Sequence, residues 1–221
     1  MIYIYNHYGV MIMHDFRYVQ KGEYQPLKND IIELLHEVQD EVRDDFTFQY
    51  HFIGSTKRNM ITRDMKSPIG FDFDIDLEIN YDEDEYNAFD IRTIFRTAIT
   101  NVSRRYGFTK CEDSTRVITI KKTNPFFSTR EHSCDFAIVD GDYYIHFFKE
   151  QQAYGWVQKS NGYKGLEKKA DILKKNGYWG EVREVYINKK NFNENPDKHS
   201  RSLYAETINE VYRRYLNTKN I

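Results

Sequence analysis

The chain has 221 residues, which is enough for one sizeable core or for a core domain with a smaller helical part. Its 32 Lys and Arg residues nearly balance its 34 Asp and Glu residues, so no overall basic field indicates a long nucleic acid as partner. With only Cys111 and Cys134, a disulfide framework is not expected, and a reduced cytoplasmic setting is favoured.

The first half of the chain alternates predicted helices and strands. Residues 1–25 are expected to form an irregular or strand-forming arm. Its apolar opening MIYIYNHYGVMIM is too short and too mixed for a signal peptide or a membrane span, so no membrane association is expected. A helix is predicted over residues 26–46, where apolar residues recur at helical spacing. Residues 47–54 alternate apolar and polar side chains and end in glycine, which is typical of a strand. Residues 55–70 are expected to form a loop, or a short helix followed by a loop.

The next predicted strand, GFDFDIDLEIN at residues 70–80, has two different faces. Phe71 begins a series of apolar side chains at every second position, which predicts one buried face. The alternate positions all carry acids and must lie on the other face: Asp72, Asp74, Asp76 and Glu78.

A helix is predicted over residues 82–106, with acids at its start and arginines at its end, ahead of Gly107. Three further strands follow, at residues 114–122, 132–140 and 143–150.

After about residue 150 the strand patterns stop. Helices are predicted over 165–190 and 199–217. This order predicts an α+β (mixed α/β) fold, with a mixed sheet flanked by helices and a helical C-terminal part. The expected division is a core with its N-terminal arm at residues 1–150 and a helical subdomain at residues 151–221.

The acidic face suggests a metal site. Asp74 and Asp76 project from one face within a few ångströms of each other, and burying two such charges without compensation would be very costly. A cation between them would remove the repulsion, and hard oxygen ligands select Mg²⁺ or Mn²⁺. The alternative is an exposed edge strand whose acids are solvated.

Two other segments favour the metal interpretation. At Gly54 and Ser55 a strand ends, the glycine would let a phosphate approach the backbone, and the serine adds a hydroxyl. Asp135 begins another apolar run and would come alongside the first pair if the two strands are neighbours. A third carboxylate could hold a second metal ion and help to activate an attacking hydroxyl.

These three segments together resemble the signature of the nucleotidyltransferase superfamily, which has the polymerase-beta-like fold. The resemblance implies that Gly54 and Ser55 hold the β- and γ-phosphates of a nucleoside triphosphate. It implies that Asp74 and Asp76 bind two divalent ions and that Asp135 binds the ion on the nucleophile side.

The resemblance covers roughly residues 26–150. The spacer between Ser55 and Asp74 is nearer in length to that of the oligoadenylate and cyclic-nucleotide synthase-like branch than to that of the smallest members. The register Asp72-x-Asp74 remains an alternative, but Asp74-x-Asp76 is preferred because apolar residues follow it.

Other candidate residues are weaker. Lys57 and Arg58 follow the Gly-Ser turn and are candidates to contact triphosphate oxygens, with solvated loop charge as the alternative. A zinc site is not expected at His132 and Cys134, because no paired CxxC or HxxxH spacing occurs, and Cys134 is assigned to the core. A basic stretch could bind triphosphate and base, or single-stranded nucleic acid by stacking and charge, although a solvated surface is favoured for most of it. It consists of Lys159, Lys164, Lys168 and Lys169, with Tyr154, Trp156 and Tyr163 interleaved.

The sequence therefore predicts a metal-dependent nucleotidyltransferase that transfers a nucleoside monophosphate from a nucleoside triphosphate to an acceptor hydroxyl and releases pyrophosphate. Its expected cofactor is Mg²⁺ or Mn²⁺. The acceptor stays open among a nucleotide, a small molecule, a protein side chain and an RNA end. The alternative is a non-catalytic nucleotide-binding sensor or partner subunit, against which the presence of all three carboxylates argues.

Overall fold

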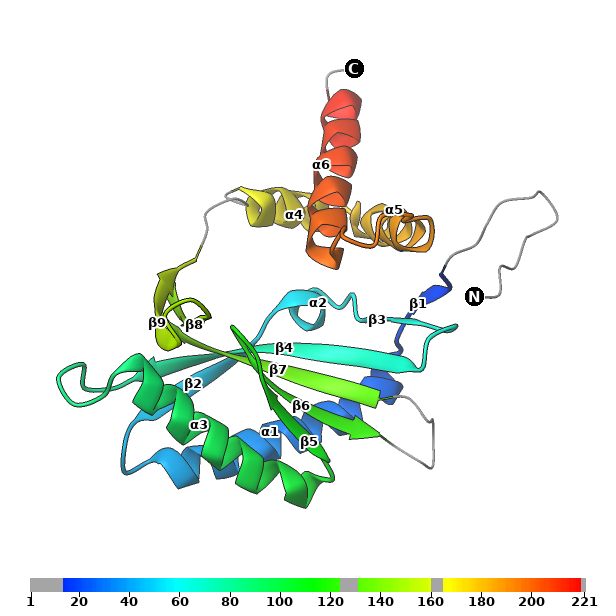
Figure 1. Cartoon of the computed structure of the whole chain (residues 1–221). Coiled ribbons are helices and arrows are strands. Elements are labelled where there is room, and N and C mark those ends of the chain that lie inside the picture. Colours follow the sequence, from blue (N-terminus) through cyan, green and yellow to red (C-terminus); the bar gives the residue numbers. More distant parts are fainter. Residues whose placement is uncertain (1–13, 124–130, 160–164, 220–221) are drawn as a thin grey trace. The chain divides into compact units, whose positions relative to one another are not determined.

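The computed structural model describes residues 14–123, 131–159 and 165–219. The chain divides into two compact units, which are described separately (Figure 1). The larger unit comprises Val19–Thr62 and Ser67–Lys159, and the remaining segments form the smaller unit.

The larger unit is built on a mixed sheet of seven strands. Five of them follow the spatial order β2-β4-β7-β6-β5, while β8 pairs with β7 and β9 pairs with β8. Strands β4 and β7 are parallel, and the other pairs are antiparallel. The strands are β2 Thr47–Phe52, β4 Ile69–Asn80, β5 Lys110–Asp113, β6 Ile118–Thr123, β7 Glu131–Asp140, β8 Tyr143–Phe148 and β9 Ala153–Gln158.

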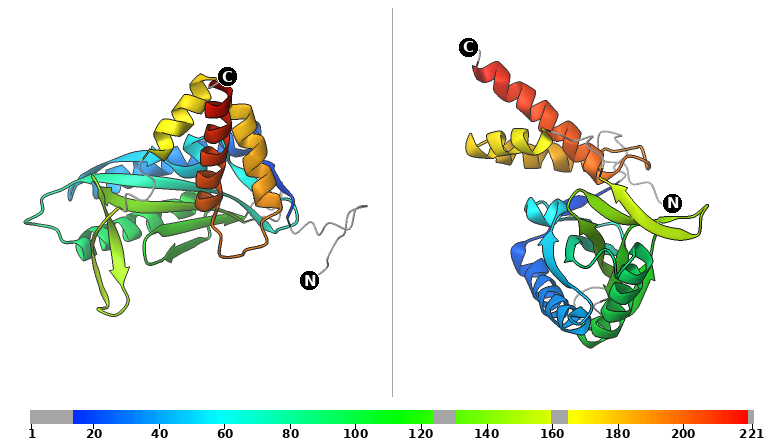
Figure 2. Two further views of the ribbon diagram at one scale, coloured as in Figure 1. Left: turned by 90° about the horizontal axis from the view of Figure 1, so that it is seen from above. Right: turned by 90° about the vertical axis from the view of Figure 1, so that its left-hand side faces the viewer.

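Two helices lie side by side on one face of this sheet, α1 (Lys21–Val42) and α3 (Ala88–Ser103) (Figures 1 and 2). The core lies between them and the sheet, because the apolar stripe of each helix and the apolar face of the strands are both buried. On β4 the predicted alternation is confirmed: every apolar side chain from Phe71 to Ile79 is buried, and every acid between them is half-buried or exposed.

The helix limits differ from the sequence prediction in both cases. Helix α1 begins at Lys21 rather than Pro26, because Glu23 accepts a hydrogen bond from the backbone N–H of Gln20 (3.1 Å) and closes the first turn earlier. Helix α3 begins at Ala88 rather than at residue 82, and a 3-10 turn, Arg104–Tyr106, follows it.

The later start of α3 has a local cause. The side chain of Asn87 accepts hydrogen bonds from the backbone N–H groups of Phe89 and Asp90, so it caps the helix, and the acids before it form a turn.

The expectation that strands stop near residue 150 is wrong. Strand β9 continues the sheet over Ala153–Gln158 by pairing with β8. The alternation in AYGWVQ is broken by Gly155, where a Cβ atom would lie 3.1 Å from the ring of Phe148, so the glycine serves close packing within the hairpin. Strand β5 and the short β3 (Thr62–Asp64) were also missing from the sequence prediction, whereas the short helix α2 (Gly54–Lys57) matches it.

The smaller unit contains α4 (Leu166–Lys175), α5 (Trp179–Asn191), α6 (Ser200–Lys219) and the strand β1 (Phe16–Tyr18), which pairs with β3. Strand β1 is attached to α5. The side-chain amide of Asn191 donates to the backbone carbonyl of Phe16 (3.2 Å), and the hydroxyl of Tyr18 donates to the carbonyl of Arg183 (2.7 Å).

The helical character of the C-terminal part is confirmed from residue 166 onward, but the helix predicted over residues 165–190 is divided into α4 and α5. Of the predicted arm, Phe16–Tyr18 form a strand and the residues from Lys21 belong to α1, while residues 1–13 lie outside the described residues. The predicted division into domains at residue 150 stays a prediction. No helix within the described ranges has the length and apolar character needed to cross a membrane.

Candidate functional site

The acidic face of β4 meets the polar face of β7 at one pair of residues. Asp74 and Asp135 are direct register partners in the parallel pairing of these strands. Partners in a parallel pair project from the same face of the sheet, so the two carboxyl groups are neighbours. Asp72 is exposed and lies opposite Ser133, two residues before this pair on each strand. The apolar partners Phe73 and Cys134 face the core, and this fixes which face the acids take.

The Gly-Ser turn packs directly on Asp74. The backbone N–H of Ile53 donates to the carbonyl oxygen of Asp74 (2.9 Å), and Gly54 follows with φ +59°. A Cβ atom at Gly54 would lie 2.3 Å from Oδ2 of Asp74, so only glycine permits this approach. Ser55 is half-buried at the same turn. Helix α2 has only four residues, so the turn offers a hydroxyl and backbone amides rather than the dipole of a long helix.

Several carboxyl groups give the site a concentration of negative charge. Burial, followed by the charges of Asp72 and Asp135, raises the pKa of Asp74 to about 6, and the nearby guanidinium of Arg58 opposes this shift. Burial also raises the pKa of Asp135, although its Oδ1 accepts a hydrogen bond from the Thr119 hydroxyl (2.6 Å), which favours the ionised form. Both carboxyl groups are thus held in surroundings that a bound cation would make more favourable.

The predicted cation candidates take different places. Arg58, at the end of α2, is close enough to Asp74 to influence its pKa, whereas the side chain of Lys57 is exposed. The sequence did not single out Lys159 as a partner of the acids. Its ammonium lies 3.5 Å from Oδ2 of Asp76. Asp76 therefore has a basic partner in direct reach.

The carboxylate oxygens of the site are suitable ligands for Mg²⁺ or Mn²⁺, but they do not by themselves complete the coordination of such an ion. Carboxylate oxygens with raised proton affinity are the hard ligands that these ions select. Within residues 14–123, 131–159 and 165–219, no three His, Cys, Asp or Glu side chains converge closely enough to form a ready metal site. Mg²⁺ is commonly held by one or two carboxylates with phosphate oxygens and water completing its coordination, so the residues fit an ion that arrives with a nucleotide.

The zinc alternative fits the structure poorly. Cys134 is completely buried in the core, as expected, and burial raises the pKa of its thiol, whereas a zinc ligand must be a thiolate. The side chain of His132 instead accepts a hydrogen bond from the backbone N–H of Phe71 (3.2 Å) through Nδ1.

The residues of the basic stretch come from more than one element of the chain. Lys159 follows β9, Lys169 lies on α4, where it donates to Asn209 (2.6 Å), and Tyr163 and Lys164 fall outside the described residues.

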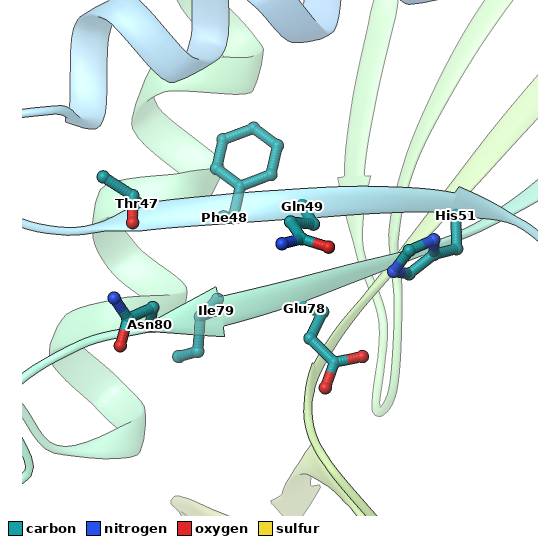
Figure 3. Close-up of a pocket in the computed structure, with 7 residues that line it drawn as sticks. All are labelled: Thr47, Phe48, Gln49, His51, Glu78, Ile79 and Asn80. Carbon is teal, nitrogen blue, oxygen red and sulfur yellow. The ribbon is translucent and has the colours of Figure 1, made fainter.

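A polar hollow of about 540 Å³ extends along the edge of the sheet next to the acids (Figure 3). Its position is set by the antiparallel pairing of β2 and β4, in which His51 lies opposite Asp76 and Gln49 lies opposite Glu78. The lining residues are Thr47, Phe48, Gln49, His51, Glu78, Ile79 and Asn80.

No protein-family model and no curated protein matches the sequence. Solved structures do match the fold. The Vibrio cholerae DncV cyclic AMP-GMP synthase in complex with the linear intermediate 5′ pppA(3′,5′)pG aligns with 87% of this chain and 54% of its own, at 16% identity and a TM-score of 0.55.

Escherichia coli DncV bound to 3′-deoxy GTP aligns with 90% of this chain and 54% of its own, at 19% identity and a TM-score of 0.52. The STING-associated CdnE c-di-GMP synthase from Capnocytophaga granulosa aligns with 87% of this chain and 62% of its own, at 15% identity and a TM-score of 0.50.

The chain thus spans about half to three fifths of the length of these structures. At these identities the similarity shows the fold. The predicted nucleotidyltransferase-type α+β architecture is confirmed, and the resemblance to the cyclic-nucleotide synthase-like branch is confirmed at the level of the fold.

Proposed function

We propose that this chain is a metal-dependent nucleotidyltransferase that acts on nucleoside triphosphates. The observation that carries the proposal is the meeting of Asp74, Asp135 and the Gly54 turn, which come from three separate segments of the chain. Two neighbouring half-buried carboxyl groups of raised pKa are costly, and a site for cations and phosphate explains why they are present.

The divalent ions, Mg²⁺ or Mn²⁺, would be held by Asp74, Asp76 and Asp135 and would supply charge neutralisation for the triphosphate. Gly54 lets the β- and γ-phosphates approach the backbone, and Ser55 donates its hydroxyl to a phosphate oxygen. Arg58 is placed to offset negative charge beside Asp74.

The transfer itself forms one bond and breaks one. The acceptor hydroxyl oxygen bonds to the α-phosphorus, the bond from that phosphorus to the oxygen bridging to the β-phosphate breaks, and pyrophosphate leaves with that oxygen. The hydroxyl proton passes to a carboxylate oxygen of Asp135, whose Oδ1 accepts a hydrogen bond from the Thr119 hydroxyl.

We further propose that the acceptor is a second nucleotide. The support is the fold shared with solved cyclic AMP-GMP and c-di-GMP synthases, together with the polar hollow beside Asp76. A small molecule, a protein side chain or an RNA end would be distinguished from it by the mass of the product. The cytoplasmic setting expected from the sequence belongs to this proposal, since nucleoside triphosphates are available there.

The test is to incubate the purified protein with each α-labelled nucleoside triphosphate and Mg²⁺ or Mn²⁺, and to identify the products by mass. Asp74→Asn and Asp135→Asn should abolish product formation. Asp44→Asn, which changes an exposed acid in the turn after α1, is the matched control and should keep full activity.

Other results would change the conclusion. Metal-dependent triphosphate binding without product, with every acceptor class supplied, would favour the non-catalytic binding module. Absence of triphosphate binding would overturn the proposal.

A further inference from the structure

The side chain of Lys159, which follows β9, reaches the acidic face of β4. Its ammonium lies 3.5 Å from Oδ2 of Asp76 and 3.2 Å from the carbonyl oxygen of Gly141. Its own backbone N–H donates to the carbonyl of Asp142 (2.7 Å). The side chain of Lys159 is 33% exposed and that of Asp76 is 19% exposed, so the pair is partly withdrawn from water.

The β7–β8 turn sets the position of the Lys159 side chain. Gly141 adopts φ +51°, a conformation that favours glycine, and its backbone N–H donates to Oε1 of Glu78 (3.3 Å) while its carbonyl accepts from Lys159. Two acids of β4 therefore contact the same turn. Glu78 accepts a hydrogen bond from its backbone directly, and Asp76 is linked to it through Lys159. Hydrogen bonds fix the backbone of Lys159 to Asp142 and its ammonium to the carbonyl of Gly141. These contacts keep the ammonium next to Asp76.

The position matters because Asp76 is one of the carboxylates proposed to hold a divalent ion. An ammonium within ion-pair distance of Oδ2 neutralises the same charge that the metal ion would use, and the two cations repel each other. Resting on the proposed function, we infer that Lys159 is a built-in counter-ion of Asp76 that a divalent cation must displace in order to bind. Divalent metal alone then binds weakly, and a nucleotide favours metal binding because its phosphates give the released ammonium a new anionic partner.

The inference is tested with Mn²⁺ alone, without nucleotide, by following the free-ion signal in electron paramagnetic resonance. Lys159→Met should bind Mn²⁺ roughly fivefold more tightly than the unchanged protein, the factor expected when one unit charge about 4 Å away stops competing in partly exposed surroundings. Lys159→Arg should retain the original affinity, because it restores the charge. Lys149→Met, on the exposed end of the same hairpin, is the matched control and should change nothing.

Equal or weaker Mn²⁺ binding by Lys159→Met would overturn the inference, and so would failure of every variant to bind the ion. Melting curves of Lys159→Met and Lys159→Arg show whether both variants are folded. Asp76→Asn separates the two proposals: if it weakens Mn²⁺ binding while Lys159→Met has no effect, the metal site stands and the counter-ion role fails. If Asp76→Asn leaves Mn²⁺ binding unchanged, Asp76 is no metal ligand, and the proposed function loses one of its three carboxylates.

Discussion

Replacing Asp74 by Asn should make the metal-free protein more stable while it abolishes nucleotidyl transfer. The pKa of Asp74 is raised from 3.8 to about 6 in the folded protein, and a shift of about two units corresponds to about 3 kcal/mol of differential interaction. Folding therefore favours the protonated carboxyl, so the cost of the ionised form is absent below pH 4, grows as the pH rises, and is complete above about pH 6. Asn carries no charge at any of these values.

The assay is urea unfolding in the presence of a metal chelator. Asp74→Asn should exceed the unchanged protein by up to about 3 kcal/mol at pH 7.5 and by roughly half of that at pH 5, where ionisation is incomplete in the folded state. Asp44→Asn should show no such pH-dependent gain. A variant of Asp74 that is less stable at pH 7.5, or whose advantage does not shrink at pH 5, would refute the view that burial and the neighbouring charges make the ionised Asp74 carboxylate costly in the folded protein.

Three further changes probe the site and its support. Gly54→Ala should lower the free energy of unfolding by roughly 1–3 kcal/mol and abolish transfer, since its methyl group would lie 2.3 Å from a carboxylate oxygen at a positive φ; urea unfolding measures this. Arg92→Met should cost about 1–3 kcal/mol in the same assay, because it removes a buried guanidinium that donates to Asp113 and to two backbone carbonyls, whereas Arg96→Met, on an exposed side chain that also faces Asp113, should cost less than about 1 kcal/mol. Thr119→Val removes a donor from Asp135, so the pKa of that carboxyl should rise, and the acidic limb of the pH–rate profile should move to higher pH.

Each of these has an outcome that would contradict it. Full activity of Gly54→Ala would show that the turn does not need close approach to β4. Equal losses for the two arginine variants would mean that burial does not decide the strength of their ion pairs. An unchanged or acid-shifted profile for Thr119→Val would remove Asp135 from the proton transfer.

The strongest part of the sequence prediction was β4. Its alternation of apolar and acidic residues is a local property of an extended backbone, so both faces of the strand could be assigned before any tertiary contact was known. The neighbouring position of Asp135 required one more condition, that its strand pairs with β4, and the structure meets that condition in exact register with Asp74. The metal and phosphate roles of these residues stay predictions.

What the sequence did not indicate depends on contacts between distant segments. The Lys159–Asp76 ion pair joins residues 83 positions apart and exists only because β9 extends the sheet. The pattern of β9 is interrupted by Gly155, whose reason is a contact with a ring on the preceding strand, and local periodicity cannot reveal such a contact. The sequence could have indicated Thr119 as a polar residue on the same face as the acids, because its strand alternates apolar and polar residues. Its role depends on the pairing of β6 with β7, which places it opposite Asp135.

The smaller unit has a consequence for how the chain is made. Hydrogen bonds between Phe16 and Asn191 tie β1 to α5 across 175 positions of sequence. During synthesis β1 leaves the ribosome early and must wait for α5, while nearly all of the sheet-forming sequence emerges in the interval and can fold first. Closing so long a separation is a late and comparatively slow event. A fragment that starts at residue 160 would lack β1, so an attempt to produce the C-terminal helices alone should retain residues 14–18 as an added strand.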